Sequence, residues 1–293
     1  MATKIHTPYP RFWRLMGTRP AGRGPGVLAD YEGPPSERPL RLVVVGKGGV
    51  GKSVIAGTMA RILARRGRKV LALDTDALPG MALSLGVKSP PVPPLMDAVD
   101  NVERGYWRLK RGIGPVRAVQ RFSTEGPDGI RVLEVGDKPA GEGPSLTPAV
   151  QAFYQLVHAL ARTRALRDWT MIGDHPAGAR QTAHDWAPYA DTLLVVTEPS
   201  WKSALTARQV TEIARARGDA VVIVASKVTG PDDVDLVQEI VGQPVAAAVP
   251  ADEAVATTDR RGVALIDHAP ESPALRAIES LVDGLVDGTT KGV

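Results

Sequence analysis

The chain has 293 residues, of which 43% are hydrophobic, and a formal net charge of +4, so it is long enough to bury a core as one large α/β domain or two small ones. It contains no cysteine, which excludes disulfides, thiolate metal sites and iron–sulfur ligation by this chain alone. The sequence has neither an apolar run as long as a membrane span nor a secretory signal, so we expect a cytoplasmic protein.

Residues 1–39 are rich in proline, glycine and arginine and follow neither helical nor strand periodicity. We expect them to form an extended arm ahead of a domain that spans residues 40–293. The group Phe12-Trp13-Arg14-Leu15 is costly to leave exposed in water. A partner-docking arm is therefore an alternative to a mobile tail.

A predicted strand over residues 40–45 leads into Gly46-Lys47-Gly48-Gly49-Val50-Gly51-Lys52-Ser53, and a predicted helix over residues 53–66 follows. The middle segment fits the phosphate-binding pattern G-x-x-x-x-G-K-[ST] in the strand–loop–helix context that this pattern requires. Glycines let backbone N–H groups turn toward phosphate oxygens, and the amino end of the helix adds positive charge. Lys52 can reach the outer phosphates, and the Ser53 hydroxyl can bind Mg²⁺. The sequence therefore predicts a nucleoside triphosphate site.

Downstream of this loop, short apolar segments alternate with helical patterns. Further strands are predicted at 69–73, 130–135, 169–173, 192–197, 220–225 and 244–249, and further helices at 148–164, 202–217, 232–241 and 273–286. Several of these strands are continuously apolar, as expected for strands that are buried on both faces of a parallel sheet. The alternation predicts one α/β domain with a doubly wound, mostly parallel sheet and helices on both faces.

An insertion at about residues 87–129 interrupts the alternation. It opens with Pro90-Pro91-Val92-Pro93-Pro94 and is poorly patterned, so we expect irregular structure. The stretch from Arg104 to Arg121 contains no acidic residue and six basic ones, namely Arg104, Arg108, Lys110, Arg111, Arg117 and Arg121. Because Tyr106 and Trp107 lie among them, this basic patch could bind non-specific DNA. The alternatives are a solvated face or a surface for an acidic partner protein.

Carboxylates follow two of the predicted strands. Asp74-Thr75-Asp76 comes one strand–helix unit after the loop, and Asp174-His175-Pro176-Ala177-Gly178 follows the strand at 169–173. Ligands bind at the carboxyl ends of strands in open α/β sheets, so these carboxylates could orient water or hold Mg²⁺, and Gly178 could present its N–H to a γ-phosphate. For the first segment, solvated carboxylates at the strand end are the alternative. His175 is interpreted as a loop residue.

The extra lysine Lys47, the segment Leu73-Asp74-Thr75-Asp76 and the segment from Asp174 to Gly178 together resemble the deviant Walker-A ATPases. That group includes the Min and Par partition proteins, the arsenite-pump ATPase and the nitrogenase iron protein. The resemblance covers roughly residues 40–285 and implies an ATPase whose two subunits dimerise around ATP. It further implies that Lys47 reaches the partner's phosphates, that Asp76 positions the attacking water, and that Asp174 holds Mg²⁺ through water.

The resemblance also implies which residues surround the nucleotide. The segment from Val249 to Val255, followed by Arg260-Arg261-Gly262, is similar to the family's adenine-side loop and helix, and Ser226-Lys227 stands where many relatives have Asn-Lys. The implied catalytic residues are Lys47, Lys52, Asp76 and Asp174, and the implied metal ligands are Ser53, Asp76 and Asp174. The implied nucleotide-binding residues are Gly46, Gly48, Gly49, Val50, Gly51, Lys52, Ser53, Val54, Gly178, Ser226, Lys227, Pro250 and Asp252.

Within this group the chain resembles the CooC-type ATPases, which help insert nickel into carbon monoxide dehydrogenase. The similar stretches are Leu71 to Gly86, Gly129 to Gly143 and Asp191 to Ser200. In that family a Cys-x-Cys-Pro metal motif follows the glycine-rich turn, whereas this chain has Ser145-Leu146-Thr147-Pro148. We therefore expect no thiolate metal site at this place.

These observations predict a slow ATPase with Mg²⁺ and ATP as ligands, which forms a homodimer on binding ATP and acts on an unidentified partner protein. The alternatives are a Par-like positioning ATPase that binds DNA and an inactive structural subunit. The last predicted helix carries the acidic residues Glu279, Asp283 and Asp287. A helix that targets a membrane surface would carry lysine and arginine on its polar face, so we expect no membrane recruitment of the Min type.

Overall fold

The computed structural model describes residues 28, 31–76, 80–87, 94–103, 106–136, 147–183 and 185–290. Its strands are β1 (Arg41–Gly46), β2 (Val70–Asp74), β3 (Val99–Glu103), β4 (Tyr106–Leu109), β5 (Thr124–Glu125), β6 (Arg131–Glu134), β7 (Thr170–Asp174), β8 (Thr192–Thr197), β9 (Ala220–Val228) and β10 (Val245–Pro250). Its α-helices are α2 (Lys52–Arg65), α3 (Gly80–Leu85), α4 (Pro115–Phe122), α5 (Thr147–Leu160), α6 (Arg180–Ala183), α7 (Trp201–Ala216), α8 (Pro231–Val241), α9 (Glu253–Arg261), α10 (Leu265–His268) and α11 (Pro273–Val286). Most of the predicted arm, residues 1–27 and 29–30, lies outside the described residues.

Eight strands form one sheet in the order β10-β9-β8-β1-β7-β2-β6-β5. All neighbouring pairs are parallel except β5 and β6, which are antiparallel. β1 lies inside the sheet, because Val43 is in register with Gly173 of β7 on one side and with Leu193 of β8 on the other. The predicted doubly wound, mostly parallel sheet is confirmed. Its parallel strands bring the segments that follow β1, β2, β7 and β8 to the same edge.

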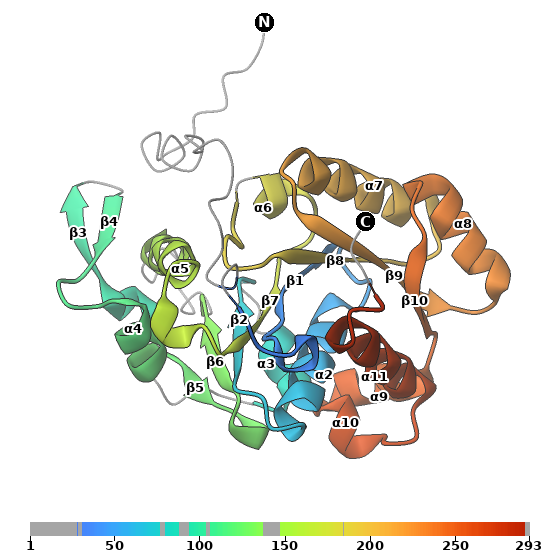
Figure 1. Ribbon diagram of the computed structural model, residues 1–293, viewed down its shortest axis with the longest axis horizontal. Coiled ribbons are helices and arrows are strands. Elements are labelled where there is room, and N and C mark those ends of the chain that lie inside the picture. The colour runs from blue at the N-terminus through green and yellow to red at the C-terminus, as the bar shows by residue number, and fades with distance from the viewer. Residues whose placement is uncertain are drawn as a thin grey trace, which may run out of the picture.

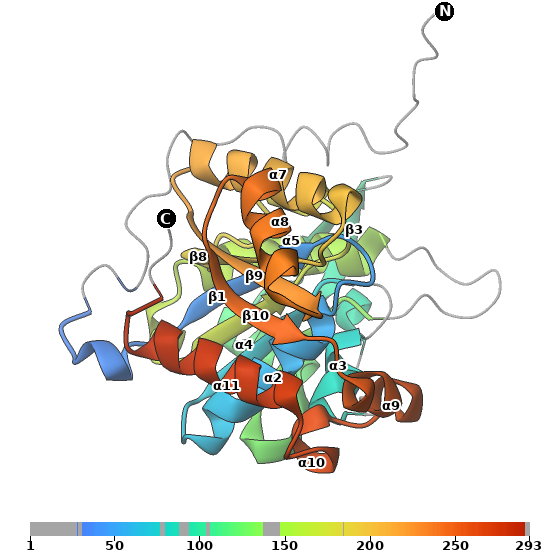
Figure 2. The same ribbon diagram turned by 90° about the vertical axis from the view of Figure 1, so that its right-hand side faces the viewer.

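Helices cover both faces of the sheet (Figures 1 and 2), with α5, α7 and α8 on one face and α2, α10 and α11 on the other. Successive residues of β1 alternate between the two cores: Val43 and Val45 pack with the first group, while Leu42 and Val44 pack with the second. This alternation explains why β1 is apolar throughout, since neither of its faces meets water. Among the described residues, no helix has the length and apolar character needed to cross a membrane.

The helix ends follow local sequence signals. The Ser200 side chain accepts a hydrogen bond from Ser203 N at the start of α7, and Ser272 does the same for Leu275 N at the start of α11, where Pro273 follows it. Gly242, with a φ of 71°, ends α8 in the left-handed conformation that glycine adopts without strain. The predicted seven strands and five helices are confirmed to within a few residues.

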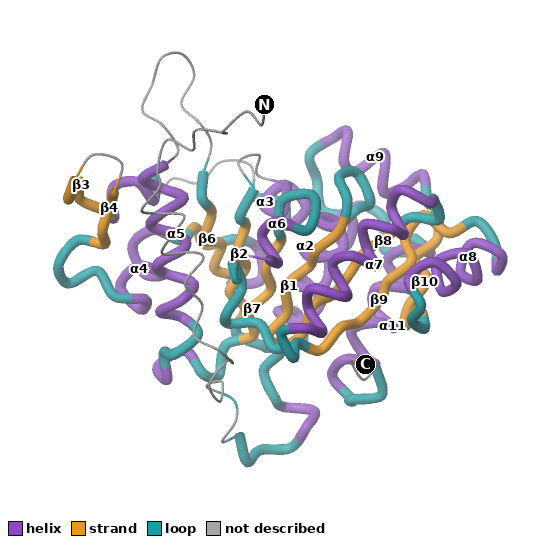
Figure 3. Tube along the Cα trace, turned by 90° about the horizontal axis from the view of Figure 1, so that it is seen from above, coloured by secondary structure: helices purple, strands orange, loops and turns teal. Residues whose placement is uncertain are grey.

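The expectation of irregular structure in the insertion is wrong for its described part. Strands β3 and β4 form an antiparallel pair (the hairpin β3–β4), and α4 follows β4. In Figure 3 the hairpin lies at one end of the molecule, beyond α5, and α8 lies at the other. Only Val99 of β3 is buried, so the strand has no apolar alternation that sequence analysis could detect.

Two glutamines of α5 hold this hairpin in place. Gln151 Oε1 accepts a hydrogen bond of 2.8 Å from Trp107 N, while Gln155 Oε1 accepts one of 3.3 Å from Leu109 N. The Gln155 side-chain amide in turn donates to Trp107 O at 3.0 Å. These side chains therefore replace the neighbouring strand that β4 lacks on this edge.

Candidate nucleotide-binding site

The predicted phosphate-binding loop connects β1 to α2. Gly46 ends β1 with a φ of 151°, and a Cβ atom at this position would lie 2.2 Å from Val196 O of β8. Gly51 has a φ of 91° and is the N-cap of α2, which begins at Lys52. Both positions therefore need glycine, one because β8 is close and the other because the backbone is left-handed. The result is a tight loop that opens onto the amino end of a helix, where anions bind favourably.

Lys52 is a buried cation within this loop. Its Nζ donates to Lys47 O at 3.1 Å. Burial lowers the pKa of the Lys52 ammonium, although the nearby carboxylates of Asp174 and Asp76 partly oppose the shift. A phosphate oxyanion would compensate for the water that burial removes from this ammonium.

Ser53 and Asp174 form a hydroxyl–carboxylate pair at the start of α2. Ser53 Oγ donates to Asp174 Oδ2 at 2.5 Å, and the buried Asp174 Oδ1 has no hydrogen-bond partner among the described residues. Burial raises the pKa of Asp174 to about 6, against the opposing effects of the Ser53 hydrogen bond and the Lys52 charge. A buried carboxylate oxygen without a partner, beside a hydroxyl, is a donor set that suits Mg²⁺, so these residues fit the predicted metal.

The two aspartates that follow β2 have different environments. Asp74 is wholly buried, and its carboxylate accepts hydrogen bonds from Asp76 N at 3.0 Å and from Met81 N at 3.1 Å. Burial raises the pKa of Asp74 well above its usual value, and the neighbouring Asp174 adds to the shift. Asp74 is therefore not a solvated strand-end carboxylate. It holds the backbone on both sides of the loop that carries Asp76, a role that sequence analysis did not assign.

The segment after β7 lies directly against the phosphate-binding loop. Gly178 N donates to Gly46 O at 3.0 Å, so in this structure the N–H predicted to face a γ-phosphate is bound to the loop itself. His175 follows Asp174 and is buried, not exposed on a loop. Burial lowers the pKa of His175 to about 3, and the charges of Arg217 and Lys52 act in the same direction. The imidazole is consequently neutral at physiological pH.

Lys47 shares a carboxylate with a second lysine. Its Nζ lies 3.3 Å from Glu198 Oε1, and Lys227 Nζ lies 3.7 Å from Glu198 Oε2. Lys227 also donates to Gly49 O of the loop at 2.6 Å, from a residue with a φ of 60°. Glu198 directly follows β8, and sequence analysis did not single it out. The available signal was its position at the carboxyl end of a strand that neighbours β1.

The residues predicted on the adenine side come from β9 and β10. Ser226 is buried beside the loop, since a Cβ on Gly51 would lie 3.4 Å from its Oγ. Pro250 ends β10. Asp252 caps α9 by accepting from Ala254 N, and its other oxygen accepts from Ser272 Oγ at 2.5 Å and from Ala274 N at 3.2 Å.

Burial acts to raise the pKa of Asp252, but these hydrogen bonds outweigh it and the net shift is downward. The Asp252 carboxylate thus holds α9 and α11 together. A nucleotide bound at this position would therefore contact the backbone of Asp252 and not its carboxylate.

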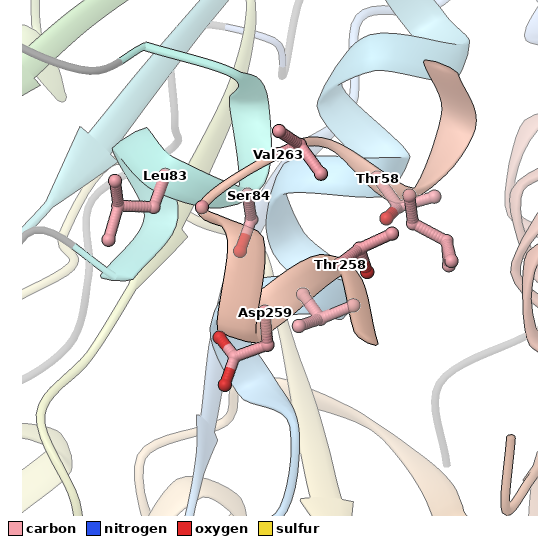
Figure 4. A pocket seen from close by; sticks show the side chains of 9 residues that line it. Thr58, Leu83, Ser84, Thr258, Asp259 and Val263 are labelled. Atoms are coloured by element: carbon pink, nitrogen blue, oxygen red, sulfur yellow. The ribbon is translucent and has the colours of Figure 1, made fainter. Parts of the chain in front are cut away.

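Val54, also predicted to bind nucleotide, lines a shallow hollow where α2, α3 and α9 meet. Figure 4 shows Thr58 of α2, Ser84 of α3 and Thr258 of α9 around this hollow. Leu83 is partly exposed beside it. The hollow is therefore next to α9, the helix predicted to lie on the adenine side, and its lining begins at Val54, directly after Ser53.

The basic patch of the insertion lies in a different part of the sequence from the candidate site residues. Its surface is less uniformly positive than its six basic residues alone would make it. Arg108 of β4 is in register opposite Asp100 of β3, and the Arg121 guanidinium lies over the Phe122 ring at 5.5 Å. Arg104 lies outside the described residues, as do Ser145 and Leu146 of the segment compared with the cysteine motif. The hairpin therefore supplies acidic residues next to the basic ones.

Comparisons with known proteins agree with this geometry. Residues 42–266 match a family described as the CobQ/CobB/MinD/ParA nucleotide binding domain, CbiA. The carbon monoxide dehydrogenase accessory protein CooC of Rhodospirillum rubrum is 28% identical over 272 residues, which cover 87% of this chain and 100% of that protein. The cell division ATPase MinD of Pyrococcus furiosus is similar in fold, with a TM-score of 0.63, 23% identity, and coverage of 85% of this chain and 99% of that one. MinD of Pyrococcus horikoshii, solved with Mg-ADP, gives a TM-score of 0.62 and 19% identity over 83% of this chain and 94% of its own.

Proposed function

Because this chain belongs to the CobQ/CobB/MinD/ParA nucleotide-binding family, we propose that it is a slow ATPase whose two subunits associate when they bind ATP. The observation that carries the proposal is the environment of two lysines in the phosphate-binding loop. Lys52 is buried inside the loop, whereas the Lys47 side chain is 38% exposed on its outer side. One ammonium is therefore available to the nucleotide of its own subunit and the other to a neighbouring molecule.

The residues around Ser53 and Asp174 support a role for Mg²⁺ in this activity. The Ser53 hydroxyl and the unpartnered Asp174 Oδ1 would hold the ion, which would neutralise phosphate charge when bound. Lys52 would hold the outer phosphates from within the loop. The loop that Asp74 fixes would hold Asp76 near the same place, where its carboxylate would orient a water molecule.

A protein client is the proposed target of the switch. The support is the likeness to CooC, which is named as an accessory protein of carbon monoxide dehydrogenase. Dimerisation would present one composite surface in the ATP state and two separate surfaces after hydrolysis, so a client could distinguish the two states. Because the chain has no cysteine, it would act on its client without passing on a metal from a thiolate site of its own.

Non-specific DNA binding is not favoured by any described contact. The hairpin places Asp100 opposite Arg108, which weakens the positive potential that a phosphate backbone would need. We therefore do not propose DNA binding as a second function.

The test is sedimentation velocity of the Asp76→Ala variant, chosen to slow hydrolysis, without nucleotide, with MgADP and with MgATP. We expect monomers in the first two conditions and dimers with MgATP. Adding Lys47→Ala to the same variant should restore the monomer, whereas adding Lys110→Ala, which removes an exposed lysine of the insertion, should leave the dimer intact. A protein that stays monomeric with bound MgATP, or a dimer that survives Lys47→Ala, contradicts the proposal.

A further inference from the structure

Glu198 lies between two lysines of the candidate site, Lys47 and Lys227. It follows β8 and contacts Lys47, which follows β1, and Lys227, near the end of β9. The backbone of Glu198 is fixed as well, because its N–H donates to Ser203 Oγ at 3.2 Å within the first turn of α7. The carboxylate is therefore presented to both lysines by a well-held turn.

The Lys47–Glu198 contact conflicts with the proposed use of Lys47. The Glu198 carboxylate in its own subunit and a phosphate in the partner subunit would compete for this one ammonium. The Lys47 side chain is 38% exposed and that of Glu198 is 25% exposed, so the pair is accessible and can break without carrying a charge through a dry interior.

We propose that Glu198 is a positioning residue that holds Lys47 in its own subunit until ATP brings two subunits together. This inference rests on the proposed function and adds to it a residue that opposes dimerisation. Lys227 completes the arrangement, because it stays paired with Glu198 after Lys47 leaves and is itself held by Gly49 O of the loop. Glu198 would then keep Lys227 as a cationic partner, and its Oε1 would keep the hydrogen bond of 3.4 Å that Ser200 Oγ donates to it.

The size of the effect follows from the exposure of the pair. Partly exposed ion pairs change an equilibrium by about 1.4- to 5-fold at room temperature. Two subunits each release one such pair when a dimer forms, so the factor is squared. Removing the Glu198 charge should therefore lower the dimer dissociation constant by about 2- to 30-fold.

The experiment compares Glu198→Gln with the unchanged residue in the Asp76→Ala background. The dimer dissociation constant is measured by sedimentation at saturating MgATP, so that changes in nucleotide affinity do not enter. We expect tighter dimers for Glu198→Gln. The matched control is Glu212→Gln, which removes the same charge from α7 where Glu212 pairs with Arg208 at 3.0 Å on an exposed face; it should leave the constant unchanged.

Two further variants show which lysine transmits the effect. In a Lys227→Ala background, Glu198→Gln should still tighten the dimer, because Lys47 is the residue released. The conservative change Glu198→Asp should fall between the wild-type residue and Gln. A loss of the effect in the Lys227→Ala background would show that Glu198 acts only through Lys227 and would overturn the inference.

The outcomes separate this inference from the proposed function. If the Asp76→Ala protein forms dimers with MgATP but Glu198→Gln and Glu212→Gln leave its dissociation constant equal, the role of Glu198 is wrong and the ATP-driven dimer stands. If no variant forms dimers while all of them bind MgADP, the proposed dimer itself is wrong. Binding of MgADP by Glu198→Gln with unchanged affinity also shows that the variant is folded.

Discussion

At the scale of single residues, the candidate site buries charged groups without giving them enough hydrogen-bond partners or opposite charges to replace the water they lose. Asp174 is 2% exposed and has one carboxylate oxygen without a hydrogen-bond partner. Lys52 is buried too, and its pKa is lowered. Such groups lower the free energy of unfolding of the protein without ligands. An ion of opposite charge stabilises them when it binds. The site is therefore organised to bind ions at the expense of its own stability.

Replacing Asp174 with asparagine should stabilise the protein in buffer free of magnesium and nucleotide. The pKa of Asp174 is raised to about 6, so keeping this group ionised in the folded state costs stability above that pH. Below its usual value near 4 the group is protonated in both states and the cost vanishes. The free energy of unfolding of Asp174→Asn should exceed that of wild type by an amount that grows from pH 4 to 6 and stays at about 3 kcal/mol at higher pH.

Urea unfolding at several pH values measures this difference, and the same variant should lose magnesium-dependent ATP hydrolysis. An unfolding free energy that falls in Asp174→Asn at pH 7.5 contradicts the expected stabilisation.

Gly46→Ala should destabilise the protein by at least about 2 kcal/mol, because its Cβ would meet Val196 O and its φ disfavours any other residue. The matched control is Gly114→Ala at the N-cap of α4, where φ is −97° and no atom lies within 4 Å of the added Cβ. Urea midpoints of the two variants give the comparison. Equal losses in both would show that contact with β8 is not the reason for glycine at 46.

The sequence predicted which residues surround the phosphate-binding loop but not all of their partners. Lys52 and Ser53 are spaced by a pattern in which each position has a chemical role, and Asp174 ends an apolar strand. Glu198 contacts Lys47, which is far away in the chain, and this contact depends on a strand order that no local pattern encodes. The contacts of Asp74 with Asp76 N and Met81 N are local, but no sequence motif marks them, so both roles became visible only in the structure.

At the scale of elements, α2 carries Lys52 and Ser53 and is anchored by a buried arginine in its middle. The Arg61 side chain is 3% exposed, and it donates to Leu85 O at 2.9 Å, to Asp128 at 2.6 Å and to both carboxylate oxygens of Asp267 at 2.9 Å. These contacts tie α2 to α3, to the turn before β6 and to α10. The helix that presents the loop is thus fixed along its length.

Asp267→Asn should lower the free energy of unfolding by about 1–2 kcal/mol, because the buried Arg61 guanidinium loses one charged partner and keeps Asp128 and the Leu85 carbonyl. Asp283→Asn is the matched control, since Asp283 pairs with Arg66 of the same helix region at 2.7 Å but is 57% exposed. That change should cost less than about 0.5 kcal/mol. Urea unfolding of both proteins checks the order, and a larger loss in Asp283→Asn would refute it.

The hairpin β3–β4 should loosen when its glutamine contacts are removed. In Gln151→Ala, the Trp107 N–H loses its 2.8 Å acceptor, so hydrogen exchange at this amide should accelerate by about tenfold. Exchange in β1 and β7, at the centre of the sheet, should stay unchanged. An acceleration spread over the whole sheet would instead mean that the hairpin supports the global fold.

Helices and strands with strong periodicity were predictable because each buries a face of its own. The shorter elements were not. β4 depends on side chains of α5 for hydrogen bonds on the edge that does not face β3, and α10, with four residues, is too short to show a period. Such elements take their shape from neighbours that the local sequence does not identify.

At the scale of the whole molecule, the site is assembled from both ends of the chain. Loops after β1, β7 and β8 meet at the edge of the sheet, and Asp252, which begins α9, also holds α11. A nucleotide bound there would contact segments across most of the chain. Its binding energy would consequently stabilise the fold as a unit and not one loop alone.

MgADP at about 100 times its dissociation constant should add about 2.7 kcal/mol to the free energy of unfolding. For a chain of this size the melting temperature should rise by about 5–10 °C. Lys52→Ala should lose this shift while keeping a cooperative transition, since it removes a phosphate contact and no core residue. Differential scanning calorimetry gives both values, and a full shift in Lys52→Ala would contradict the assignment of Lys52.

The position of β1 inside the sheet also has a consequence for synthesis on the ribosome. β1 emerges early, but its partners do not: Arg41 pairs with Met171, and Leu42 pairs with Thr192. The loop that follows β1 therefore cannot take its final shape until about two thirds of the chain has been translated, and the apolar strand must wait unpaired until then. Nascent chains that stop before β8 should bind chaperones and fail to bind nucleotide, although they contain the complete phosphate-binding sequence.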